Sequence, residues 1–443
     1  MCLFGQGAKP SDLASLAIGI GWRQRNLGFV LTNRLCDTET FGKHVDQRSI
    51  DIVDTAAETG ELRVCTLFIC RFCHRSHDYH AKRNVSTILR TCHNLFVPPC
   101  APVMTAEVIP LPRKRPEDMP SLDPMLALTA QGMNSVNSVI LDRMQSEIPL
   151  IPALAGHLIS GGGKRLRPML TLAGAELVGY SGTRHHKLAA AVEFIHTATL
   201  LHDDVVDGSD LRRGKAAANI IYGNPATVLV GDFLFSRSFE LMTEDGSLKV
   251  LKILSGASAI IAEGEVDQLT AQRQIETSEE RYLHIIGAKT AALFAAASRI
   301  AAVVAECGEA QETALDDYGR NLGVAFQLVD DAIDYDSEAA EMGKDQGDDF
   351  REGKMTLPVI LAFSRGTEEE RKFWKAAISG VKSDEEALEH AIHLIGKYNA
   401  VEDTRARARH FADRAVDAIS IFPDSKARHA MAEAAHFAVT RGY

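Results

Sequence analysis

An apolar stretch runs directly into an acidic cluster at residues 198–207, which read ATLLHDDVVD. The same arrangement recurs at residues 324–334, VAFQLVDDAID, so that Asp203 and Asp330 lie 127 positions apart (330 minus 203). Side chains three or four positions apart share a helix face, so each Asp-Asp-x-x-Asp cluster gathers its carboxylates within one turn. Carboxylates that close stay ionised together only with a strong cation between them. We therefore expect two acidic helix ends on opposite walls of one cavity, bridged by Mg2+ that also binds substrate phosphates.

A pair of solvated acidic helix ends is the plain alternative. However, a carboxylate at a helix C-terminus opposes the helix macrodipole and costs stability unless a cation compensates it. Two such ends, each preceded by a strongly apolar helix, favour the metal interpretation.

The composition limits the class of protein. The chain has 443 residues, of which 46% are hydrophobic, and its net charge is -11. That charge argues against a nucleic-acid partner. No run of about 18 uncharged apolar residues occurs, so we expect no transmembrane helix. We expect no signal peptide either, and a cytoplasmic location.

The first hundred residues differ from the rest. Seven of the eight cysteines precede residue 101, which is unlike a secreted disulfide framework. Residues 1–103 lack sustained helix or strand patterning, and we interpret them as a non-family extension, disordered or translated from a mis-called start, with Met104 as the natural start. Residues 104–124 form a Pro-rich linker. The CxxCH at 70–74 matches haem attachment or a zinc site in form only, because no regular framework surrounds it.

From about residue 122 onward, Leu, Ala, Ile and Val recur at helical spacing, and no strand alternation competes. The pattern predicts helices at 123–149, 151–160, 165–178, 185–206, 225–243, 246–272, 278–306, 310–335, 356–364, 368–379, 383–398, 400–421 and 424–440. We therefore expect residues 125–443 to form one all-α domain, a large antiparallel helical bundle around a central cavity.

Basic residues accompany the acidic helix ends. Residues 161–168, GGGKRLRP, place three cations after a flexible loop at an expected helix start, which suits a diphosphate. The P-loop spacing is absent. Other cations follow or flank the acidic segments: Arg212, Arg213, Lys289, Lys344 and Lys354. For Lys289, inside an apolar helix, the plain alternative is a snorkelling surface lysine. Together the cations imply two anionic ligands, one bridged by metal and one held directly by Lys and Arg.

These motifs, in this order, resemble those of the trans-polyprenyl diphosphate synthases: GKRLRP at 163–168, HTATLLHDD at 196–204, RRG at 212–214, KT at 289–290, FQLVDD at 326–331 and GKD at 343–345. The resemblance spans nearly all of 125–360. It implies the isoprenoid synthase fold, a homodimer, and similarity to the long-chain bacterial group that makes the octaprenyl or decaprenyl tail of ubiquinone.

The resemblance also implies roles at matching positions. Mg2+ on the allylic diphosphate would be held by Asp203 and Asp207, and the metal on the opposite wall by Asp330 and Asp334. The residues expected to act in catalysis are Asp203, Asp204, Asp207, Lys289, Asp330 and Asp331. The allylic substrate would be contacted by Arg212, Lys289, Thr290, Gln327 and Lys344. Isopentenyl diphosphate would be bound by Lys164, Arg167, His196 and Arg213, and Lys354 would be a further diphosphate contact.

Product length can be argued from the helix before Asp203. Thr199 and Ala198 lie about 6–7.5 Å deeper along the axis, at 1.5 Å per residue. In short-chain members of the family a bulky aromatic residue there forms a floor, whereas both side chains are small here, and Ile195 follows on the same face. We therefore expect a C40–C50 product, with a shorter geranylgeranyl or farnesyl product as the alternative.

Two other functions fit less well. A terpene cyclase would replace the second acidic cluster and would not need the isopentenyl pocket. A non-catalytic partner subunit would lose the acidic clusters. The sequence leaves open eight or ten isoprene units, a farnesyl or geranyl primer, and whether the apolar product is released through a transient membrane contact.

Overall fold

The computed structural model describes residues 52–55, 63–66, 119–160, 163–212, 214–336, 346–380 and 384–441. The chain divides into two units, Met1–Glu117 and Asp118–Tyr443. In the first unit, the described strands β1 (Ile52–Thr55) and β2 (Arg63–Thr66) pair antiparallel, with Ile52 opposite Thr66. The remainder of the expected extension at 1–103, and the expected linker up to residue 118, lie outside the described residues.

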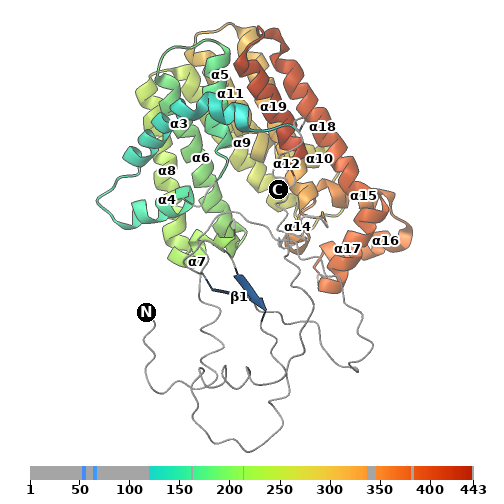
Figure 1. Ribbon diagram of the computed structural model, residues 1–443. Coiled ribbons are helices and arrows are strands. Elements are labelled where there is room, and N and C mark those ends of the chain that lie inside the picture. Colours follow the sequence, from blue (N-terminus) through green and yellow to red (C-terminus); the bar gives the residue numbers. More distant parts are fainter. Residues whose placement is uncertain are drawn as a thin grey trace, which may run out of the picture. The chain divides into compact units, whose positions relative to one another are not determined.

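The second unit is built almost entirely of helices (Figure 1). The first half contains α3 (Asp123–Arg143), α4 (Leu150–Ser160), α5 (Leu166–Leu177), α6 (Arg184–Val206), α7 (Ala218–Tyr222), α8 (Asn224–Asp245) and α9 (Leu248–Ala271). The middle contains α10 (Glu279–Ile286), the π-helix η2 (Gly287–Ala291), α11 (Ala292–Val304) and α12 (Glu309–Ile333). The last part contains α14 (Asp348–Glu352), α15 (Leu357–Arg365), α16 (Glu368–Ile378), α17 (Glu385–Lys397), α18 (Ala400–Ala418), the 3-10 turn η3 (Ile419–Ile421) and α19 (Lys426–Thr440).

The expected all-α architecture is confirmed, and the differences are local. The first predicted helix, 123–149, ends already at Arg143. The predicted helix 278–306 is three elements, because a π-turn interrupts it at Gly287–Ala291. Two five-residue helices, α7 and α14, and the two-residue strands β3 (Leu211–Arg212) and β4 (Lys215–Ala216) were not predicted. All of these lie in or beside loops, where the apolar pattern is too short to be read.

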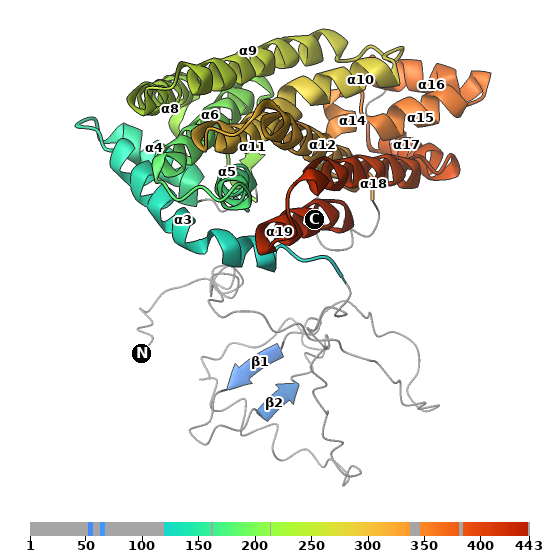
Figure 2. The ribbon, with the colours of Figure 1, turned by 90° about the horizontal axis from the view of Figure 1, so that it is seen from above.

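Helix α11 is the central element, in contact with α5, α6, α9 and α12 (Figure 2). All but one of its residues are buried. Helix α12 approaches it closely because α12 carries glycines on that face: a Cβ on Gly319 would lie 2.3 Å from the Phe294 carbonyl oxygen, and one on Gly323 would lie 2.6 Å from the Ala291 Cα. This contact fixes how α12 is rotated, and therefore which of its acidic side chains meet the cavity.

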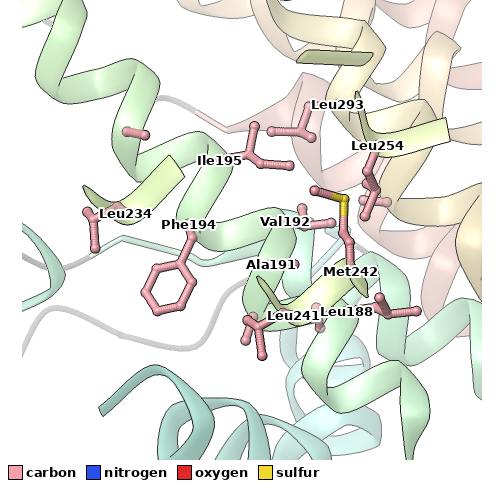
Figure 3. Packing of buried hydrophobic residues seen from close by; sticks show 14 of the residues in the cluster. Leu188, Ala191, Val192, Phe194, Ile195, Leu234, Leu241, Met242, Leu254 and Leu293 are labelled. Atoms are coloured by element: carbon pink, nitrogen blue, oxygen red, sulfur yellow. The ribbon is translucent and has the colours of Figure 1, made fainter. Parts of the chain in front are cut away.

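The apolar core continues between α6 and α8. Figure 3 shows Val192, Ile195, Leu234 and Leu254 interleaved in one buried cluster. Val192, Ile195 and Leu234 are fully buried in it. This packing holds α6, and with it the first acidic cluster, firmly in the bundle.

One continuous helical stretch, Glu279–Val304, is long and apolar enough to cross a membrane, with a mean hydropathy of 1.3. However, 83% of its most apolar 18-residue window is buried inside the protein. It is therefore accounted for as the core of the bundle, because a buried core helix needs the same apolar composition.

Candidate active site

Both acidic clusters end a helix and meet one cavity. Helix α6 ends at Val206 with Asp207 as its C-cap, and α12 ends at Ile333 with Asp334 as its C-cap. Asp203 and Asp330, the first carboxylates of the two clusters, both line a cavity of about 390 Å³. That volume lies within the usual range for a small-molecule site. Each acidic cluster therefore contributes one carboxylate to the same cavity, and a metal between them stays a prediction.

The first cluster divides its carboxylates between the cavity and the core. Asp204 is fully buried and accepts a 2.6 Å hydrogen bond from Arg212 Nε. Its backbone carbonyl accepts from the Asn219 amide of α7. Asp207 instead accepts a bond of 3.4 Å from Lys354. Asp204 therefore holds the hairpin that carries Arg212 against α6, and does not itself line the cavity.

Lys289 stands between two carboxylates at the cavity wall. Its Nζ lies 2.7 Å from Glu265 of α9 and 4.0 Å from Asp203. Burial raises the pKa of Asp203 to about 6; Lys289 opposes this rise, and the nearby carboxylates Glu265 and Asp207 add to it. Lys289 is thus a cavity residue, and the snorkelling alternative is ruled out by these contacts.

The second cluster has a protein partner for every carboxylate. Asp330 accepts a 2.8 Å bond from Arg441, which follows α19. Asp331 accepts from the Tyr282 hydroxyl and from the Gln327 amide at 2.6 and 2.7 Å. Asp334 accepts from the backbone N–H groups of residues 348 and 349, both at 3.2 Å, and so caps α14. Only Asp330 of this cluster lines the main cavity.

A smaller cavity of about 110 Å³ adjoins this cluster and is lined by Tyr282, Asp331, Asp349 and Lys354 among others. Burial raises the pKa of Asp331 and Asp334 to about 8, and Asp349 adds to both rises. Burial lowers the pKa of Lys354, but the carboxylates Asp349, Asp207 and Glu352 outweigh it, so the pKa lies above its ordinary value. Lys354 therefore stays charged between the two acidic clusters.

The basic segment at 163–168 contributes cations to the main cavity. Arg165 is the residue before α5, with a left-handed φ of 46°, and α5 begins at Leu166. Lys164, Arg167 and His196 all line the main cavity. The Arg167 guanidinium lies 3.1 Å from His196 Nε2 and 4.4 Å from the centre of the Phe294 ring. The three predicted isopentenyl contacts that the structure describes thus come together, while Arg213 lies outside the described residues, as does Lys344 of the allylic set.

The other predicted allylic contacts also line the main cavity: Arg212, Thr290 and Gln327. Thr290 donates a 2.8 Å hydrogen bond to Gln327 Oε1. Sequence reasoning missed Glu265 and Arg441, which pair with Lys289 and Asp330. The one local signal for Glu265 is its position after Gly264 on an apolar helix, and Arg441 gives none, because its partner lies 111 positions away.

The three residues expected to set product length differ in whether they line the cavity. Thr199 lines the cavity, whereas Ala198 and Ile195 are fully buried in the core cluster and do not line it. Ala198 and Ile195 belong to a buried cluster with side chains of α6, α8, α9 and α11, part of which Figure 3 shows around Ile195. Ala198 and Ile195 therefore lie behind the cavity wall, and Thr199 is the residue of this group that borders the cavity.

Comparisons with known proteins agree with the motifs. The polyprenyl synthetase family model matches residues 148–395. The chain is 47% identical over 321 residues to the octaprenyl diphosphate synthase of Escherichia coli, which covers 72% of this chain and 99% of that protein. It is similar to the structure of a Caulobacter crescentus polyprenyl synthase complexed with calcium and isoprenyl diphosphate, with a TM-score of 0.71, 52% identity, and coverage of 74% of this chain and 100% of that one. A decaprenyl diphosphate synthase from Rhodobacter capsulatus gives a TM-score of 0.70 and 51% identity, covering 72% and 98%. The chain therefore belongs to the polyprenyl synthetase family.

Proposed function

We propose that this protein is a Mg2+-dependent prenyltransferase that condenses isopentenyl diphosphate onto an allylic diphosphate and makes a long-chain, C40–C50, all-trans polyprenyl diphosphate. The observation that carries the proposal is a single cavity with two sets of anion-binding groups. Asp203 and Asp330 line it as carboxylates that a divalent cation would join to one diphosphate, with Lys289 beside Asp203. Lys164 and Arg167 line the same cavity as cations that bind an anion directly. A single-substrate enzyme would have no need of the second basic set.

The acidic residues suit a divalent cation. Asp203 is partly buried beside Glu265 and Asp207, and burial raises its pKa to about 6 although the positive charge of Lys289 opposes the rise. Among the described residues, no three His, Cys, Asp or Glu side chains are close enough to hold one ion alone. That is the arrangement expected of Mg2+, which keeps waters and takes further oxygens from a substrate diphosphate. Asp203 and Asp207 would hold one ion and Asp330 would hold another at the second cluster, where Asp334 would join only by releasing the backbone of α14.

The residues divide the reaction between them. When bound, Mg2+ would neutralise the leaving diphosphate of the allylic substrate. Lys289 and Arg212 add positive charge on the same side, so the allylic C–O bond can break to give a carbocation. Lys164, Arg167 and His196 hold the isopentenyl diphosphate so that its double bond lies near that carbocation. The proton that is then lost goes to the departing diphosphate, and the apolar rings of Phe294 and Phe326 at the wall limit water.

The long product is supported by the octaprenyl and decaprenyl synthases that the chain resembles. A shorter geranylgeranyl or farnesyl product is the alternative, and the burial of Ala198 and Ile195 in the core cluster is the observation that keeps it in the test. Incubation of the purified protein with farnesyl or geranyl diphosphate and isopentenyl diphosphate, followed by reversed-phase chromatography, distinguishes the two. Products of eight to ten isoprene units support the proposal, and accumulation of a C15 or C20 product contradicts it.

The homodimer is a further part of the proposal. Helices α7 to α9 expose large apolar side chains, among them Ile220, Leu229, Ile260 and Val266, whose exposed fractions are 55, 66, 43 and 61%. Clustered apolar exposure of this kind is typical of an interface. Light scattering of the purified protein tests it, with a mass of one chain as the contradicting result. The cytoplasmic location and the supply of the ubiquinone side chain are proposed from the sequence resemblance, and a membrane contact for product release stays open.

A further inference from the structure

A chain of hydrogen bonds links α10, α12 and the π-turn η2. The Tyr282 hydroxyl of α10 donates to Asp331 Oδ2 of α12 at 2.6 Å. The other oxygen of Asp331 accepts from Gln327 Nε2 at 2.7 Å. Gln327 Oε1 in turn accepts from the Thr290 hydroxyl of η2 at 2.8 Å. Because both oxygens of Asp331 accept, the Gln327 amide has one orientation, with its oxygen toward Thr290 and its nitrogen toward Asp331.

The four side chains of this hydrogen-bond network lie at the wall between the two cavities. Gln327 and Thr290 line both the main and the smaller cavity, whereas Tyr282 and Asp331 line only the smaller one. Tyr282 and Asp331 are only 3 and 4% exposed. Burial raises the pKa of the Tyr282 hydroxyl well above its ordinary value, so it remains a donor throughout the working range. Removal of one donor would leave a buried oxygen of Asp331 without a hydrogen bond, and the desolvation of that oxygen would then destabilise the arrangement.

The π-turn itself is held from two sides by glycines. A Cβ on Gly264 of α9 would lie 2.8 Å from the Ala288 Cβ and 2.9 Å from the Lys289 backbone nitrogen. A Cβ on Gly323 of α12 would lie 2.6 Å from the Ala291 Cα. The backbone of η2 thus touches both neighbouring helices without an intervening side chain. Small movements of η2 would be passed directly to Lys289, which reaches from it to Glu265 and Asp203.

We propose that Tyr282 is a positioning residue: through Asp331 and Gln327 it orients the π-turn that presents Lys289 and Thr290 to the allylic diphosphate. The inference rests on the proposed function, because it assigns these two side chains to the allylic substrate. It gives Asp331 a role inside the protein as the acceptor that joins two elements, distinct from that of Asp330 at the cavity. The isopentenyl set is anchored separately, on α5 and α6.

Steady-state kinetics of Tyr282→Phe test the proposal, because this change removes only the hydroxyl. We expect the KM for the allylic diphosphate to rise about tenfold, the size of effect that follows when a buried polar group loses one of its hydrogen-bond partners. The KM for isopentenyl diphosphate should stay within about twofold. A purely structural role would move both constants together with the thermal midpoint.

Tyr318→Phe is the matched control. Tyr318 is a fully buried tyrosine of α12 whose hydroxyl donates a 2.8 Å bond to the Met431 carbonyl, and it lines neither cavity described above. It should lose similar stability and keep both KM values. The double variant Tyr282→Phe/Thr290→Val adds a coupling test, since two breaks in one chain should together cost less than the product of the single effects.

The outcomes separate the two proposals. A wild-type protein that releases no diphosphate from the two substrates overturns the proposed function. An active wild type whose Tyr282→Phe variant shows equal changes in both KM values, or fully multiplicative effects in the double variant, overturns the positioning role alone. Should Tyr282→Phe not fold, Asp331→Asn carries the test, because Asp331 does not line the main cavity and an amide cannot accept from both Tyr282 and Gln327. It should raise the allylic KM selectively, and an unchanged allylic KM would overturn the inference.

Discussion

The two acidic clusters have the same sequence pattern and different surroundings. In the first, Asp203 lies in the cavity beside Lys289, and the partner of Asp207 is another cavity-side lysine, Lys354. In the second, a guanidinium, a phenol, an amide and two backbone N–H groups already bind the three carboxylates. The helices also differ one turn earlier, where Thr199 stands before the first cluster and Phe326 before the second. Identical motifs therefore end in different surroundings: the carboxylates of the first stand beside cavity lysines, and those of the second are mostly bound by the protein itself.

The largest expected effect is at the first cluster. Asp203→Asn removes a charge at the cavity wall and should lower the rate of diphosphate release on the order of a thousandfold, since metal and electrostatic stabilisation carry the ionisation step. Asp142→Asn on α3, whose side chain is 77% exposed, is the matched control and should keep its activity. A loss of less than tenfold in Asp203→Asn would remove the first cluster from the chemistry.

The difference between Thr199 and Phe326 can be tested by giving α6 the same aromatic residue that α12 has at this position. Thr199→Phe places a ring in the cavity and should shift the main product to fewer isoprene units, as read by reversed-phase chromatography. Ala198→Phe should also shorten the product, but at a cost of about 1–3 kcal/mol in stability, because Ala198 is already fully packed. An unchanged product distribution for both variants would show that the chain grows along another route.

Within the second cluster, variants of the neighbouring residues Asp330 and Asp331 should differ in their Mg2+ dependence. Asp330→Asn should raise the Mg2+ concentration for half-maximal activity on the order of tenfold, because Asp330 alone of this cluster lines the main cavity. Asp331→Asn should leave that Mg2+ concentration within about twofold of the wild-type value and should raise the KM for the allylic diphosphate. Equal Mg2+ shifts in the two variants would show that Asp331 is a ligand after all.

The smallest expected effect is on stability and depends on pH. Burial raises the pKa of Asp203 and Asp349 to about 6, and of Asp331 and Asp334 to about 8, from an ordinary 3.8. The folded protein therefore holds more protons than the unfolded chain from about pH 4 to pH 8, and its stability falls as the pH rises through this window. With a chelator present, the thermal midpoint should decrease as the pH is raised from 5.5 to 8, by roughly 2–4 °C for each kcal/mol lost from the free energy of unfolding. Mg2+ with inorganic diphosphate should raise it most at pH 8, and a midpoint that rises with pH under chelation would contradict the assignment.

Much of this comparison was predictable from local sequence. Apolar residues at helical spacing located the long helices, and the motifs placed Asp203, Asp330, Lys164 and Arg167 at one cavity. What could not be read was which member of each cluster faces inward. Adjacent residues on a helix point about 100° apart, and the rotation of α12 is set by close contacts of Gly319 and Gly323 with α11 and η2.

The partners of the second cluster were also out of reach of sequence reasoning. Arg441 and Tyr282 lie 111 and 49 positions from the carboxylates they bind. Neither belongs to a recognisable pattern, because a single buried tyrosine or a terminal arginine has many ordinary explanations. The π-turn at Gly287–Ala291 was missed for a similar reason: its apolar flanks continue the helical period on both sides.

The pairing of Lys289 with Glu265, of Lys354 with Asp207 and of Arg212 with Asp204 has a consequence for ionic strength. A diphosphate that enters this cavity does not meet bare positive charge, and it must take cations over from carboxylates that already hold them. Its arrival is an exchange of one anion for another, in which added salt weakens the pairs that are lost as well as those that are gained. The affinity of the site should therefore respond to salt much less than its number of basic side chains suggests.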